Sequence, residues 1–171
     1  MTVAEFEKVV NALVSKVEPD IFIILEEESL TLTNKIRQRV KSKGTIGEDA
    51  VKTSDYSTLY GGKWKKKREK EGLQTAYKDL HFSPSGLFTT LKPRERERTA
   101  DAIRVLSSVD KDATNRHRTY KEVVEKLSEQ ESKRGSLKSG DYVTNPTKEE
   151  MKEAQENVRQ RVINLFKQYG L

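Results

Sequence analysis

Apolar residues near the N-terminus recur every three or four positions, a spacing that places them on one face of a helix. They are Phe6, Val9, Val10, Leu13, Val14 and Val17. Thr2 can cap this helix, and Pro19 interrupts it and suits the first turn of a second helix. The second stripe comprises Ile21, Ile24, Leu25, Leu32, Ile36 and Val40, and Gly44 is a suitable stop. We therefore expect two consecutive helices, at about residues 3–18 and 20–42.

Two further helices are predicted in the C-terminal part, between residues 119 and 168. Thr119 can cap a helix that ends near Gly135 and carries Tyr120, Val123, Val124 and Leu127. Thr147 stands three residues before Glu150, which is the spacing of a capping box. The last helix then offers one apolar face, made of Met151, Ala154, Val158, Val162, Leu165 and Phe166. We expect this face to pack against the N-terminal helices or a neighbouring copy.

A small antiparallel sheet is predicted in residues 76–110. Its expected strands are 77–82, 87–91 and 103–109, the first two joined by the turn-like residues 83–86. The charged run 94–98 is expected to be a connector or an exposed hairpin. The predicted fold class is therefore α+β, a single domain over residues 1–171 in which terminal helices pack on the sheet.

A long polar segment without periodicity, residues 44–75, separates the N-terminal helices from this sheet. Such a long loop is usually disordered or is ordered by a binding partner. Within it, six cations surround one aromatic residue between Lys63 and Lys70. This run could form a short helix, with only Trp64 to bury. We expect the segment to be mobile in an isolated subunit, because it has few apolar residues to offset the ordering entropy.

The same segment holds the residues that we expect in a docking surface. They are Tyr56, Tyr60, Lys63, Trp64, Lys65, Lys66, Lys67, Arg68 and Lys70. Tyr60 and Trp64 are expected to anchor a contact between subunits, although a Trp64 buried within its own chain is the competing interpretation. The basic run has three interpretations: a solvated loop, a site for an acidic protein neighbour, and a grip on a phosphate backbone.

Composition adds to this picture. The hydrophobic fraction is 33% and the charged fraction is 35%, so we expect a thin core that is completed against copies or partners. The formal charge of +6 suggests an acidic partner, either nucleic acid or an acidic protein surface. A basic surface that serves solubility explains the charge equally well, because acidic residues are interspersed with the cations.

Several kinds of site find no support in the sequence. Cysteine is absent, which excludes disulfides and thiolate metal sites. His81 and His117 lack a metal-ligand spacing, and no nucleophile motif is present, so we expect neither a cofactor, nor a metal, nor enzymatic activity. The acidic N-terminus does not resemble a secretory signal, and the longest apolar run, 21–25, is too short to cross a bilayer. We expect a soluble protein that folds in a reducing cytoplasm.

The order of features over residues 25–168 resembles a known family. Arg39 and Gly44 precede a loop with Gly47, Ser57 and Tyr60; a Lys-rich stretch then ends at Gly72, and Asp79, Leu80, Ser83, Leu87, Thr89 and Leu91 follow. The segments 120–127 and 147–151 are similar to two closing helices of the same family. The pattern resembles the phage tail-completion and virion-morphogenesis family, which includes head–tail connector and tail-terminator proteins.

This resemblance implies a structural protein without catalytic residues. The subunit would join a homo-oligomeric ring at the neck or upper tail, beside portal, neck or tail proteins. It would be located in the virion and assembled in the cytoplasm of the bacterial host, without a membrane partner. Genomic DNA would pass through the ring without specific binding, because tight phosphate contacts would add drag. We therefore expect the basic run to face a neighbouring protein.

Two other functions stay open. The chain could be a small basic nucleic-acid-binding protein whose segment Lys63–Lys70 grips phosphate, in which case binding should depend steeply on salt. A hydrolase is the weakest alternative, because it would need a pocket with a perturbed titratable pair and the sequence indicates none.

Overall fold

The computed structural model describes residues 3–56, 62–79, 92–99, 102–108, 114–115 and 118–170. Its helices are α1 (Val3–Lys43), α2 (Lys63–Lys70), α3 (Tyr120–Lys133) and α4 (Lys148–Gln168). Its strands form three antiparallel pairs: β1 (Thr45–Ile46) with β2 (Val51–Lys52), β3 (Lys92–Arg98) with β4 (Ile103–Ser108), and β5 (Thr114–Asn115) with β6 (Arg118–Thr119). The predicted α+β class is confirmed.

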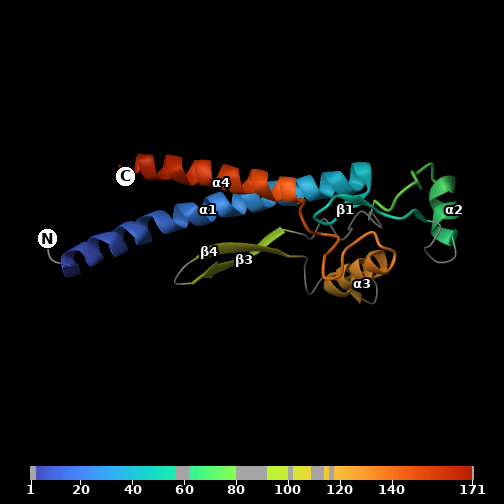
Figure 1. The fold of residues 1–171 in the computed structure, drawn as a ribbon, viewed down its shortest axis with the longest axis horizontal. Helices are drawn as coiled ribbons and strands as arrows, with labels where there is room; N and C mark the ends of the chain where they lie inside the picture. The colour runs from blue at the N-terminus through green and yellow to red at the C-terminus, as the bar shows by residue number, and fades with distance from the viewer. Residues whose placement is uncertain are drawn as a thin grey trace.

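Helix α1 is the spine of the molecule (Figure 1). Helix α4 runs along one side of it and the hairpin of β3 and β4 lies along another, so that both contact α1. Helices α2 and α3 lie toward the C-terminal end of α1, whereas both chain termini lie toward the opposite end.

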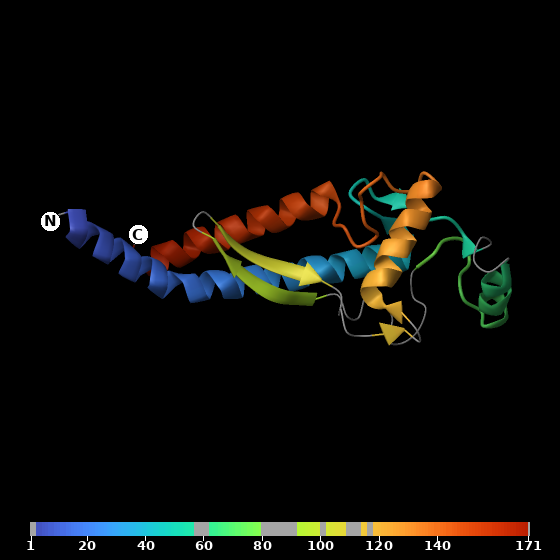
Figure 2. The ribbon, with the colours of Figure 1, turned by 90° about the horizontal axis from the view of Figure 1, so that it is seen from below.

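The prediction of two helices separated at Pro19 is wrong, because α1 is continuous over 41 residues with Pro19 inside it. An internal proline removes a hydrogen bond and destabilises a helix by roughly 3 kcal/mol. Here α4 offsets that loss by packing on both sides of the proline. The α1 residues in the shared apolar cluster are Leu13, Val17, Ile21 and Ile24. The helix bends in its N-terminal half (Figure 2), as expected for a helix with an internal proline.

Helix α4 packs on α1, as predicted, and begins at the predicted capping box. The Thr147 hydroxyl accepts a hydrogen bond from the Glu150 backbone at 3.1 Å, and the Glu150 carboxylate accepts one from the Thr147 backbone at 2.8 Å. Val158, Val162 and Leu165 of α4 pack in the cluster with α1. Met151 and Phe166 are 39% and 36% exposed, so the buried face is narrower than predicted.

A second apolar cluster lies at the C-terminal end of α1. Its buried members are Ile36, Val40, Ile46, Val124, Leu127, Leu137 and Val143. They come from α1, β1, α3 and the chain that follows α3. The predicted Thr119 cap of α3 is confirmed, because Thr119 and Glu122 form a complete capping box.

The β3–β4 hairpin corrects part of the predicted sheet. Strand β4 confirms the strand expected at 103–109, but its partner is the charged run 94–98, which forms most of β3. Alternate residues of a strand face the same side. Arg96 and Arg98 therefore both reach α1, where they pair with Glu26 at 2.7 Å and Glu18 at 2.6 Å.

Two other predicted strands are not present as expected. Residues 77–79 have no strand conformation, because their polar groups bond to helices and to another loop instead. Residues 80–82 and 87–91 lie outside the described residues. The expected loop 44–75 is also more structured than predicted, since its described parts contain the β1–β2 hairpin and α2. Residues 57–61 of that segment lie outside the described residues.

Candidate docking site on helix α2

Helix α2 lies at the end of the molecule farthest from the two termini (Figure 2). It follows Gly62, whose φ of 80° is left-handed and suits glycine. Arg68 is the only buried residue of the helix, with 6% of its surface exposed. An arginine therefore takes the place that an apolar residue usually has in anchoring a helix.

The Arg68 guanidinium is held on three sides. One of its nitrogens, Nη2, donates to Asp79 Oδ2 at 2.6 Å, and Nε donates to the Gln74 carbonyl at 3.0 Å. The guanidinium carbon lies 4.5 Å from the centre of the Tyr56 ring, within the range of a cation–π contact. The planar fork of arginine can make these bonds and stack at once, which a lysine cannot do.

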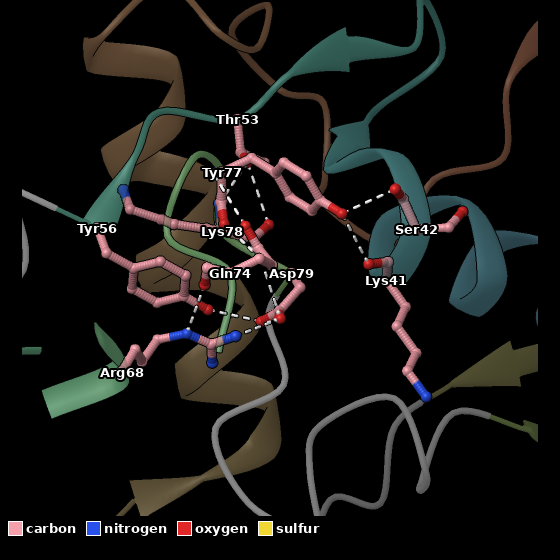
Figure 3. A network of polar contacts seen from close by, with 9 residues as sticks. All are labelled: Lys41, Ser42, Thr53, Tyr56, Arg68, Gln74, Tyr77, Lys78 and Asp79. Carbon is pink, nitrogen blue, oxygen red and sulfur yellow. Dashed lines mark hydrogen bonds and ion pairs between the residues drawn. The ribbon is translucent and has the colours of Figure 1, made fainter. Parts of the chain in front are cut away.

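Tyr56 completes this anchor by bonding the other oxygen of the Asp79 carboxylate (Figure 3). Its hydroxyl donates to Asp79 Oδ1 at 2.6 Å, and the whole residue is buried. Burial, together with the hydrogen bond to the Asp79 carboxylate, raises the pKa of Tyr56 well above its usual range. The phenol therefore stays protonated and acts as a permanent donor.

The segment 74–79 connects this anchor to the end of α1. Gln74 Nε2 donates to the Tyr77 carbonyl at 2.9 Å and to Asp79 Oδ2 at 3.1 Å. The Tyr77 hydroxyl donates to the carbonyl of Ser42 at 2.7 Å and to that of Lys41 at 3.3 Å (Figure 3). The single hydroxyl hydrogen of Tyr77 is thus shared between two of the last carbonyls of α1, which have no partner within the helix.

Lys78 fastens the same segment to α3. Its ammonium, fully buried, donates to Glu131 Oε1 at 2.7 Å and to Ser54 Oγ at 2.7 Å. Burial alone would raise the pKa of Glu131, but the hydrogen bond and charge of Lys78, with the Ser54 hydrogen bonds, outweigh it and lower that pKa. The charged form of the Glu131 carboxylate is therefore favoured, and the ion pair ties the support of α2 to the second apolar cluster.

Four lysines share the exposed face of α2. Lys63, Lys66, Lys67 and Lys70 are spaced i, i+3, i+4 and i+7, which a helix of 3.6 residues per turn places on one side. All four are exposed, and we call them the lysine face. Like charges at these spacings destabilise an isolated helix by about 0.2–0.5 kcal/mol per pair. Bound negative charge would relieve that repulsion.

The structure divides the predicted docking residues into four groups, of which the half-buried Trp64 and Lys65 are described below. Lys63, Lys66, Lys67 and Lys70 are exposed, as docking requires. Tyr56 and Arg68 were wrongly expected on this surface, because both side chains are buried and donate hydrogen bonds to the buried Asp79 carboxylate. Tyr60 lies outside the described residues.

Trp64 and Lys65 are half-buried beside the lysine face. The Lys67 ammonium lies 5.2 Å from the centre of the Trp64 ring, and Lys65 Nζ lies 3.5 Å from Asp55 Oδ2. Neither residue is fully available to a partner. The support of α2 was not predicted from the sequence; its residues are Gln74, Lys78, Asp79 and Glu131. A single arginine among lysines was the signal that could have indicated an anchor.

Other parts of the described structure offer little chemistry. A groove of about 430 Å³ lies at the start of α4, but Thr147 in its wall caps α4 and Lys148 pairs with Asp49. Among the described residues, no three His, Cys, Asp or Glu side chains are grouped to hold a metal ion. His81 and His117 lie outside those residues. No helix in the described ranges combines the length and apolarity needed to cross a membrane.

Comparison with known proteins gives no relative from which a function could be transferred. No family model matches the chain, and neither a curated protein nor a solved structure matches it.

Proposed function

We propose that this protein is a structural, non-catalytic component of a phage head–tail junction or upper tail. In this proposal its subunits form or decorate a ring in the virion, and the lysine face docks each subunit on an acidic surface of a neighbouring portal, neck or tail protein. The observation that carries the docking role is the lysine face itself, held on the body by the buried Arg68–Asp79 pair. The virion setting rests on the resemblance of the sequence to the tail-completion family.

The anchor supports docking because it fixes the orientation of α2 before a partner arrives. Arg68 and Asp79 side chains are only 7% and 9% exposed, and Tyr56 and Gln74 both donate to the same carboxylate. A pre-ordered helix loses less conformational entropy on binding than a mobile loop. Lysines act as point charges with flexible stems, which suits long-range attraction to an acidic surface.

The surroundings of Trp64 favour a protein partner over single-stranded nucleic acid. Proteins that bind single strands usually offer aromatic side chains on which bases stack. Trp64 is the aromatic residue of α2, but it is half-buried and lies beside the Lys67 ammonium. The lysine face therefore has charge for a partner but no open stacking surface within α2.

The test is to reverse all four lysines to glutamate, which changes the net charge from +6 to about −2 because each reversal removes two charges. The variant should keep its helical circular dichroism and its oligomers but fail to enter phage particles, through like-charge repulsion at the docking surface. The control reverses four exposed lysines elsewhere, Lys121, Lys126, Lys152 and Lys167, and should assemble normally.

The same variants test the nucleic-acid alternative. Normal particles that package or eject DNA abnormally would place the lysine face on the DNA path and contradict the proposal. A titration of the unmodified protein with duplex DNA gives the second readout. Affinity that falls steeply with salt, and that is lost on reversal of the lysine face, would favour the nucleic-acid-binding function.

A further inference from the structure

The packing between α1 and α4 stops before α1 does. The last contacts of the α4 end reach Leu13, Lys16 and Asp20: Tyr169 donates to Asp20 Oδ2 at 2.9 Å, and the Lys16 ammonium lies 5.2 Å from the Tyr169 ring. Helix α1 continues past this point and projects beyond α4 (Figure 1, Figure 2). From residue 4 to residue 12, every side chain that the structure describes is exposed. We call residues 3–12 the projecting end.

The apolar register that α4 covers continues into the projecting end. In a seven-residue repeat, Val3, Val10, Val17 and Ile24 fall on one core position and Phe6 and Leu13 on the other. Leu13, Val17 and Ile24 pack with α4, but Val10 is 38% exposed. Val9 and Val14 flank the register and are 60% and 41% exposed. The apolar stripe thus continues along α1 into the projecting end, whereas α4 packs only on the part of the stripe from Leu13 onward.

A lone helix of this kind is poorly stabilised. Ten residues extend about 15 Å, and isolated helices shorter than about 12–15 residues are marginal in water. Valine, which is β-branched, lowers helix propensity further. The projecting end therefore has the composition of a helix that is stabilised by packing against another helix.

We infer that the projecting end packs against the same segment of further copies of this chain, in a small bundle of helices that joins the subunits. β-Branched residues at one core position with Leu or Phe at the other are typical of helices that pair with their own kind. Val9 and Val14 flank the two core positions and make the apolar stripe wider than the strip that one partner helix would bury. This width favours a bundle of several helices over a pair of two helices.

Charge also favours a second copy as the partner. The projecting end holds Glu5, Glu7 and Lys8, a net charge of −1, whereas the whole chain carries +6. Copies can therefore approach through this end with much less like-charge repulsion than the rest of the basic molecule would cause. The inference rests on the homo-oligomer of the proposed function and names the surface that forms it, but it does not depend on the lysine face.

The test compares Val10→Asp with Asn11→Asp in the full chain. Both changes introduce the same charge into the projecting end, but only residue 10 lies on the stripe. Sedimentation equilibrium of the unmodified protein up to about 100 μM should give a multiple of 19.6 kDa. Val10→Asp should weaken association about tenfold or more, because a buried charge replaces a buried valine. Asn11→Asp should leave association unchanged.

Dilute samples of all three proteins should share one melting temperature, because the projecting end supports no described part of the body. A monomeric unmodified protein at about 100 μM would overturn both this inference and the homo-oligomer of the proposed function. A Val10→Asp variant that keeps the full oligomeric mass would overturn the inference alone, since the copies would then join through another surface.

Discussion

Six cations stand within the eight residues of α2, yet only Arg68 is buried. The difference follows from side-chain chemistry, because a guanidinium is weakly hydrated and bonds a carboxylate, a carbonyl and an aromatic face together. A lysine ammonium is strongly hydrated and stays in water unless a partner carboxylate is also buried, as Glu131 is for Lys78. Single residues thus decide which cation of the run is buried and which cations are exposed.

Replacing Arg68 with methionine should therefore destabilise the protein. The change leaves the buried Asp79 carboxylate without its guanidinium, and removal of one partner from a buried ion pair typically lowers the free energy of unfolding by about 3 kcal/mol. Urea denaturation measures the loss, and hydrogen exchange should show faster exchange in α2. Lys66→Met is the control and should change stability by less than about 0.5 kcal/mol. Equal effects of the two variants would contradict the anchoring role.

Asp49 is a second single residue with a measurable effect, because its carboxylate makes the stability of the fold depend on pH. Hydrogen bonds from Lys138 and Lys148 lower its pKa from 3.8 to about 2. A carboxyl with a lower pKa in the folded state stabilises the fold fully above its unfolded value, near 4, and this contribution is lost as pH falls through about 2.

An NMR titration of Asp49 should therefore report a pKa near 2 in the unmodified protein. Replacing both Lys138 and Lys148 with alanine should raise that pKa toward its ordinary value. Lys152→Ala, a nearby exposed control on α4, should leave it unchanged. A pKa that stays low in the double variant would show that another group stabilises the carboxylate.

At the scale of elements, α1 ends where the sequence predicted, but a distant residue also fixes this end. Gly44 has a left-handed φ of 63°, and its N–H donates to the Val40 carbonyl at 3.0 Å. The Tyr77 side chain lies so close that a Cβ at residue 44 would fall 2.2 Å from Tyr77 Cδ2. Glycine is thus required both by the backbone conformation and by the close approach of Tyr77.

Substitution of alanine at two glycines separates these effects. Gly135 has a similar φ of 73°, but an added Cβ there would meet no atom within 4 Å. Gly135→Ala should reduce stability by about 1 kcal/mol, the ordinary cost of a left-handed alanine. Gly44→Ala should lose at least about 1 kcal/mol more, because Tyr77 must give up its hydrogen bonds to α1. Equal losses in thermal or urea unfolding would mean that Tyr77 adapts without penalty.

The whole molecule is held together by α1, whose two halves contribute to separate apolar clusters. Val17 and Ile24 are buried with Leu165 near one end, and Ile36 and Val40 are buried with α3 near the other. Such a division suits a chain with 33% hydrophobic residues, because each cluster is small and depends on a few side chains. The integrity of the molecule therefore depends on helices that are distant in sequence.

Removal of residues 158–171 should unfold or precipitate the protein. The deletion removes Val158, Val162 and Leu165 and exposes the α1 side of their cluster. Fully exposing one such side chain costs about 1.5–3 kcal/mol, so the sum is comparable to the stability of a small domain. Solubility after expression and circular dichroism provide the measurement. Removal of residues 170–171 alone keeps the three side chains and should give a soluble product, and a soluble, assembly-competent product of the longer deletion would refute this packing role.

The sequence by itself determined the features that depend on neighbours within a turn or two. The Thr119 and Thr147 caps, the span of α3 and α4, strand β4 and the spacing of the lysine face all follow from local rules. These features could be predicted because capping and periodicity involve residues three to eight positions apart. The α+β class followed from the same local patterns.

Only the tertiary structure decided which other elements and side chains each helix and strand contacts. Helix α1 continues through Pro19 because α4 packs on both sides of it, and the charged run of β3 forms a strand because β4 and the α1 carboxylates pair with it. Arg68 is buried because Asp79 and Tyr56, 11 and 12 residues away, converge on it. Burial and pairing are set by distant partners whose approach local patterns do not encode, so α2 became recognisable as an anchored helix only after folding brought those partners together.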